Sequence, residues 1–110
     1  MNDLVKRLTE GSHPIAAERS SSPLELREQI ERKFVLLNFT GTRGGTELGS
    51  QLDMERTDIS SADFNQGTGV VHLVGNLTLN YDQVQLVADI DLATLKGAGH
   101  LVLIDAPQAP

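Results

Sequence analysis

The side chains that can do chemistry in this chain lie in strand-like segments toward its C-terminus. His72, Asp89, Asp91 and His100 all fall where apolar residues alternate with other types. Alternate residues of a strand point to opposite faces of a sheet, so these four side chains share one face. An imidazole beside a carboxylate can serve as an oriented general base. Two imidazoles and a carboxylate can instead hold a metal ion such as Fe(II).

Three predicted strands between residues 69 and 104 must position these side chains. Asn80-Tyr81-Asp82-Gln83 is typical of a turn, and Lys96-Gly97 is typical of a two-residue hairpin turn. The apolar residues stay in phase if Leu79 faces Val84 and Leu92 faces Leu101. These registers place His72 directly opposite Asp91, and His100 diagonal to Asp91.

This arrangement leaves three interpretations open. His72 and Asp91, with Asp89 nearby, can form an acid–base pair; His72, Asp91 and His100 can bind a metal; or the opposed His and Asp are a routine contact of matched charge on a wet strand face. We favour the last, because an imidazole opposite a carboxylate is common on exposed strands. We therefore expect no bound metal and no cofactor.

The preceding segments predict a hairpin and two helices. Residues 34–40 and 48–54 alternate as strands, with Arg43-Gly44 as a two-residue turn and Phe39 opposite Leu48. The glycine-rich loop around Arg43 can also cradle an anion, although a phosphate loop normally opens a helix and a strand follows here. A short helix begins the chain, and Ser22-Pro23-Leu24-Glu25 carries the signals of a second helix start.

The predicted fold is an α+β domain, a five-stranded antiparallel meander that forms a curled sheet or a partial barrel. Both N-terminal helices are expected to pack on one face of it. Residues 1–21 are expected to form a short helix and a linker, residues 22–105 the core domain, and residues 106–110 a disordered tail.

Composition excludes several classes of function. The net charge of −6 falls entirely on residues 34–110, and the chain has three Phe, one Tyr and no Trp. An acidic sheet with so few aromatic side chains is a poor surface for nucleic acid. The chain has no cysteine, which rules out disulfides and thiol chemistry. No apolar run is long enough for a membrane helix, so we expect a cytoplasmic protein without membrane contact.

The face that carries His72 is of mixed character, because it also holds Val74, Asn76, Val87, Val102 and Ile104. Three explanations remain for it. The face can line the inside of a curled sheet and enclose a cavity for a small apolar ligand; it can contact a copy of the chain or another protein; or it is simply wet.

Two functions follow from this face. The first is a non-catalytic binding or assembly module that acts through Val74, Asn76, Val87, Val102 and His100, for example as a homo-oligomer or as an accessory to a larger enzyme or complex. The second is a small cofactor-free enzyme, such as a hydrolase, isomerase or cyclase, with His72 and Asp91 as its acid–base pair. Small size and the lack of a cofactor motif favour the first.

Overall fold

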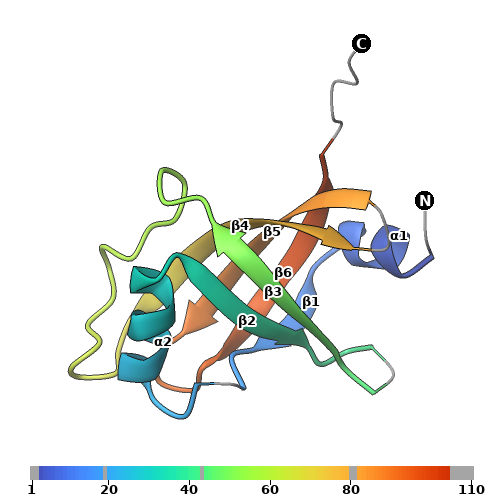
Figure 1. The fold of residues 1–110 in the computed structure, drawn as a ribbon. Coiled ribbons are helices and arrows are strands. Elements are labelled where there is room, and N and C mark those ends of the chain that lie inside the picture. Colours follow the sequence, from blue (N-terminus) through green and yellow to red (C-terminus); the bar gives the residue numbers. More distant parts are fainter. Residues whose placement is uncertain (1–2, 19, 43, 80–81, 105–110) are drawn as a thin grey trace.

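The chain folds into a closed antiparallel barrel of six strands with two helices. The computed structural model describes residues 3–18, 20–42, 44–79 and 82–104. The elements are α1 (Asp3–Thr9), β1 (His13–Ala16), α2 (Pro23–Glu31), β2 (Phe34–Phe39), β3 (Thr46–Leu52), β4 (Val70–Leu79), β5 (Asp82–Asp91) and β6 (Lys96–Leu103). Each strand pairs with its neighbours in chain order, and β1 pairs with β6 to close the barrel (Figure 1). None of the described helices is long and apolar enough to cross a membrane.

The strand that closes the barrel is the one that the sequence analysis missed. In β1, Ile15 lies opposite Phe39 of β2 on one side and Gly97 of β6 on the other. The predicted five-stranded antiparallel meander is present as β2–β6, but a sixth strand closes it, so the sheet is a closed barrel rather than a curled sheet or a partial barrel. Four residues with a proline among them are too short to show the two-residue periodicity of a strand.

The alternating apolar residues fill the interior of the barrel. Side chains of Val35, Leu37, Val71, Leu73, Val84, Leu86, Ile90 and Leu101 are essentially inaccessible to solvent. This confirms which face of each predicted strand belongs to the core. The opposite face, which carries His72 and His100, lies outside the barrel, so the hypothesis that it encloses a cavity is wrong.

The two helices lie at opposite ends of the barrel rather than on one face of a sheet (Figure 1). Val5 and Leu8 of α1, and Leu26 and Ile30 of α2, are fully buried in the same core as the strands. A closed barrel exposes its core only at its two ends, so an apolar helix stripe is best buried there.

The start of α2 follows its sequence signal closely. The Ser22 hydroxyl accepts a hydrogen bond from the Glu25 N–H at 3.3 Å, which caps the helix. The Glu25 carboxylate accepts from the N–H of Ser21 at 3.0 Å and from the Ser21 hydroxyl. These two bonds stabilise the charged form and hold the pKa of Glu25 below its ordinary value.

All three predicted hairpin registers are wrong, but each is displaced by an even number of residues. Leu48 lies opposite Leu37 rather than Phe39. Leu77, not Leu79, lies opposite Val84, and Leu86, not Leu92, lies opposite Leu101. Because the side-chain period of a strand is two, an even displacement keeps every apolar residue on the core side.

The turn between β5 and β6 explains the largest of these displacements. The β5–β6 turn spans residues 92–95, so Lys96 and Gly97 belong to β6 and are not the turn. The Asp91 carboxylate accepts from the Ala93 N–H at 2.9 Å, and Leu95 adopts a left-handed φ of 57°. Leucine rarely adopts that conformation, so its place in the turn is hard to predict. Between β4 and β5, residues 80–81 of the predicted turn lie outside the described residues.

Candidate functional site

The predicted acid–base pair forms, but with a different carboxylate. His72 Nδ1 lies 2.8 Å from an Oδ atom of Asp89, its cross-strand neighbour on β5. Asp91 lies instead between Val70 and Lys96. The predicted pairing of His72 with Asp91 is therefore wrong, as a direct result of the displaced register.

A second carboxylate approaches His72 from the loop between β3 and β4. Asp58 and His72 exchange backbone hydrogen bonds, with N···O distances of 2.8 and 2.9 Å. The hydroxyl and N–H of Ser60 bind the Asp58 carboxylate and lower its pKa, and His72 adds a smaller electrostatic effect. The environment of this imidazole is therefore acidic on two sides.

The structure does not bring the three residues of the hypothetical metal site together. His100 lies opposite Val87, away from the row that holds His72 and Asp89. In residues 3–18, 20–42, 44–79 and 82–104, no three His, Cys, Asp or Glu side chains form a group that could hold a metal ion.

The His72–Asp89 pair lies on an open surface. The side chains of His72 and Asp89 are 41% and 61% exposed. Two hollows in the described surface are lined without either residue: one lies beside the end of β4 and the start of β5, the other beside the β5–β6 turn. Neither of these hollows would position a substrate against the pair.

Asp89, Asp91 and Lys96 lie at one end of the outer face of β4, β5 and β6, and the part of this face toward Ile104 carries no Asp, Glu, Lys or Arg. We call this region the neutral face. Reading across the strands, it contains Asn76, Thr78, Gln83, Gln85, Val87, His100, Val102 and Ile104. Val102 is 41% exposed, whereas Val74, which the sequence analysis placed on the contact surface, is only 4% exposed. Val74 is therefore not available to a partner.

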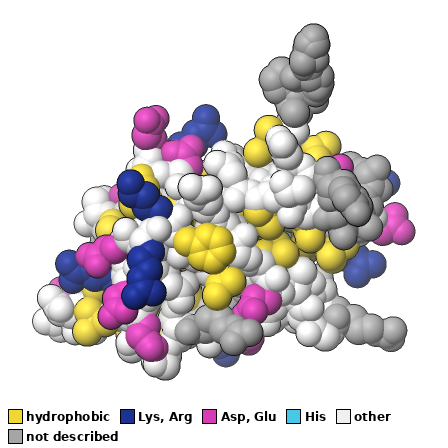
Figure 2. All heavy atoms as spheres, viewed as in Figure 1, with side chains coloured by type: hydrophobic (Ala, Val, Ile, Leu, Met, Phe, Trp, Pro, Cys, Tyr) yellow, Lys and Arg dark blue, Asp and Glu magenta, His cyan; other side chains and the backbone are white. Residues whose placement is uncertain are grey.

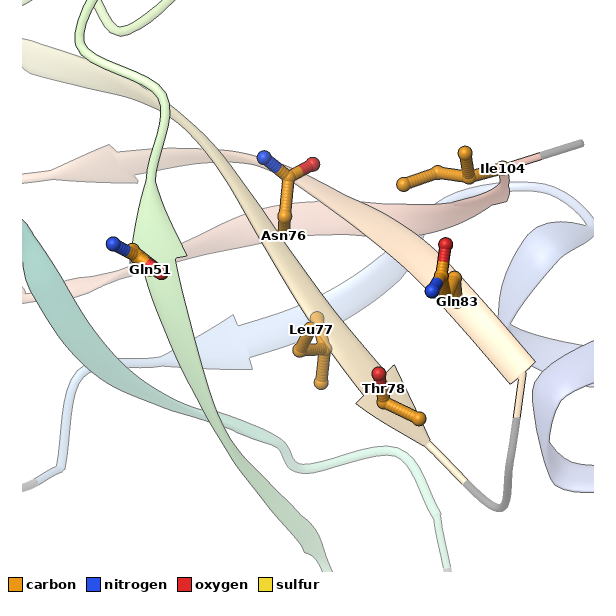
Figure 3. A pocket seen from close by; sticks show the side chains of 6 residues that line it. All are labelled: Gln51, Asn76, Leu77, Thr78, Gln83 and Ile104. Carbon is orange, nitrogen blue, oxygen red and sulfur yellow. The ribbon is translucent and has the colours of Figure 1, made fainter. Parts of the chain in front are cut away.

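One of these hollows lies at the edge of the neutral face. It has a volume of about 290 Å³ and is lined by Gln51, Asn76, Leu77, Thr78, Gln83 and Ile104. Figure 3 shows that these side chains come from β3, β4, β5 and the residue after β6. Binding pockets for small molecules usually enclose roughly 300–1,000 Å³. This hollow is small and open, so it does not favour the predicted small apolar ligand.

The sequence analysis did not name Gln51, Thr78 or Gln83 as site residues. Thr78 and Gln83 have the same strand parity as Asn76 and Gln85, so alternation alone could have found them. Gln51 could not be found in this way, because no sequence signal shows that β3 lies beside β4. Arg43, the candidate for anion binding, lies outside the described residues, as does the predicted disordered tail, residues 106–110.

No protein-family model matches the chain, and no curated protein matches it. What the protein does is therefore inferred from its own surface.

Proposed function

We propose that this protein is a non-catalytic assembly module, and that two copies associate through their neutral faces. The observation that carries the proposal is the neutral face itself: eight neighbouring outward positions without Asp, Glu, Lys or Arg. The same barrel carries Asp89, Asp91 and Lys96 only one or two rows away.

The charge of the chain favours contact at this face. Two copies, each with a net charge of −6, repel one another over most of their surfaces. Contact through the neutral face avoids placing carboxylates opposite carboxylates, and it removes no charged group from water. Depletion of charge is also what distinguishes the core of a protein interface from the rest of a protein surface.

Apolar side chains on this face supply the driving force. Val102 is 41% exposed, and Val87 and Ile104 are partly exposed beside it. Removing such side chains from water stabilises association. A single self-complementary face produces a twofold dimer, which is the commonest oligomer of soluble proteins.

The alternative function, a small enzyme built on His72, has less support. Its carboxylate partner is well exposed, and neither hollow described above includes the imidazole. A general base needs a substrate held within hydrogen-bonding reach, and neither of the two hollows would hold one beside His72.

The experiment compares Val102→Lys with Val70→Lys. Both valines point outward from the same sheet and are 41% and 42% exposed, but Val70 lies in the charged row beside Asp91 and Lys96. Each variant reduces the net negative charge by one, which by itself would favour dimers. Sedimentation equilibrium gives the dissociation constant of each.

We expect Val102→Lys to raise the dimer dissociation constant at least about tenfold, because it places an unpaired charge in the contact. Val70→Lys should leave the constant unchanged within about twofold, a difference well below 1 kcal/mol. A wild-type protein that stays monomeric at every accessible concentration refutes the proposal. So does an equal effect of the two lysines.

A further inference from the structure

The wall of the barrel is weakly joined between β3 and β4, two long strands that share as few pairs as the short strand β1 shares with β2. These strands pair only where Gln51 meets Asn76 and Leu52 meets Gly75. Between Thr46 and Ser50 of β3 and between Leu77 and Leu79 of β4, the two strands share no further register pair. We call the space between residues 46–50 and 77–79 the seam. Neighbouring strand pairs are much longer: β4 and β5 pair along their whole length.

Two residues direct their backbone polar groups into the seam. The Leu52 N–H donates to the Lys33 carbonyl on the β2 side at 2.8 Å, so by alternation Gly49 faces away from β2, toward β4. The Val74 carbonyl accepts from the Asp53 N–H at 2.7 Å, so by the same alternation Thr78 faces β3. Within the described part of the chain, no register pair joins Gly49 to Thr78 across the seam.

The core is also incompletely covered at the seam. Leu77 and Leu79 point toward the interior but are only partly buried, whereas Val71 and Leu73 on the same strand are fully buried. Figure 2 shows hydrophobic side chains at the surface between β3 and the end of β4. Beside the point where the strands separate, the Ser50 hydroxyl is fully buried and has no hydrogen-bond partner.

We infer that the seam binds an extended, uncharged segment of another protein by strand addition. Free backbone groups at a sheet edge give affinity to such a segment, and the side-chain environment selects its sequence. Residues of the segment that point inward would cover Leu77 and Leu79, and those that point outward would meet the amides of Gln51 and Asn76. No charged side chain lines the hollow at the Gln51 end of the seam, so an uncharged alternating sequence suits that end; the exposed Glu47 lies at the other end.

This binding site does not depend on the proposed self-association. The two sites share Asn76 and Thr78, but the seam uses backbone groups of β3 and β4, whereas Val102 lies on β6 and does not line the hollow. The Val102→Lys protein should therefore keep the seam site even if it no longer forms dimers.

The test uses a random heptapeptide library selected on the wild-type protein, with each selected peptide measured on Thr78→Pro and Thr78→Val. Proline removes the Thr78 N–H that faces the seam, and proline is tolerated at strand edges. Valine removes the hydroxyl and keeps the N–H, so it is the matched control. Circular dichroism verifies that each variant is folded. If the Thr78→Pro protein is unfolded, we instead measure the wild-type protein with the same selected peptides, each methylated at alternate amide nitrogens.

We expect selected peptides to alternate apolar and uncharged polar residues. They should lose at least about tenfold in affinity on Thr78→Pro or on N-methylation, as expected for the loss of backbone hydrogen bonds, and keep it on Thr78→Val and Val102→Lys. The inference is overturned if no peptide is enriched. It is also overturned if the selected peptides bind Thr78→Pro as well as wild type, or tolerate methylation at every amide.

Discussion

Truncation of Ile15 to alanine tests whether β1 is a structural strand of the barrel. Ile15 is 1% exposed and pairs with both β2 and β6. Its Cδ1 atom lies 2.5 Å from the position that a Cβ atom on Gly99 would occupy. The isoleucine thus fills the space that the missing side chain of Gly99 leaves inside the barrel.

This packing determines how much free energy of unfolding the Ile15→Ala substitution should cost. Ile→Ala substitutions in cores cost about 2–5 kcal/mol, and more when the site cannot collapse around the cavity. Gly99 has no side chain that could move into the space, and the neighbouring strands are held by their pairing. We therefore expect Ile15→Ala to lower the free energy of unfolding by about 3 kcal/mol. For a domain of this size, that corresponds to a decrease in Tm of roughly 10–20 °C.

Urea unfolding followed by circular dichroism measures this change. The control is Leu24→Ala, which truncates an aliphatic side chain that is 48% exposed. Its effect should stay within about 0.5 kcal/mol, as for most surface substitutions. If Ile15→Ala is as mild as this control, residues 13–16 behave as a linker and the closed barrel is refuted.

Three further perturbations test the packing and the electrostatics. Gly97→Ala should cost more than about 3 kcal/mol in thermal unfolding, because its Cβ would lie 1.7 Å from the carbonyl oxygen of Asp89; a near-normal Tm would contradict this. Ser50→Ala should raise stability by about 1 kcal/mol in urea unfolding, because it removes a buried hydroxyl without a partner, and a clear loss of stability would show that the hydroxyl is satisfied. Glu25 has a lowered pKa, so its stabilisation relative to Glu25→Gln should be complete above its ordinary pKa of 4.5 and disappear as the pH falls through the lowered value. An advantage over Glu25→Gln that grows on acidification would contradict that sign.

Strand periodicity predicted the two faces of the barrel well. It assigned Val84 and Leu101 to the core and His72 and Val102 to the other face, and both assignments are confirmed. The error in each register did not matter for this result, because displacements by two or six residues leave every side chain on its own face.

The same displacements did matter for the site. Contact across a strand pair depends on the register itself, so His72 meets Asp89 rather than Asp91. The register depended on turn geometry, and the left-handed conformation of Leu95 carries no sequence signal. The closure by β1 and the seam between β3 and β4 arise from contacts between distant segments, which local patterns do not encode.

The most direct test of the self-association is a dilution series of the wild-type protein followed by amide NMR signals. The signals of the neutral face, in particular Val87, His100 and Val102, should move on dilution, and those of Val70 and Asp91 should stay in place. High salt should shift the equilibrium toward the dimer, because it screens the repulsion between two acidic chains. Spectra that do not change with concentration, or changes confined to the charged rows, would contradict the account.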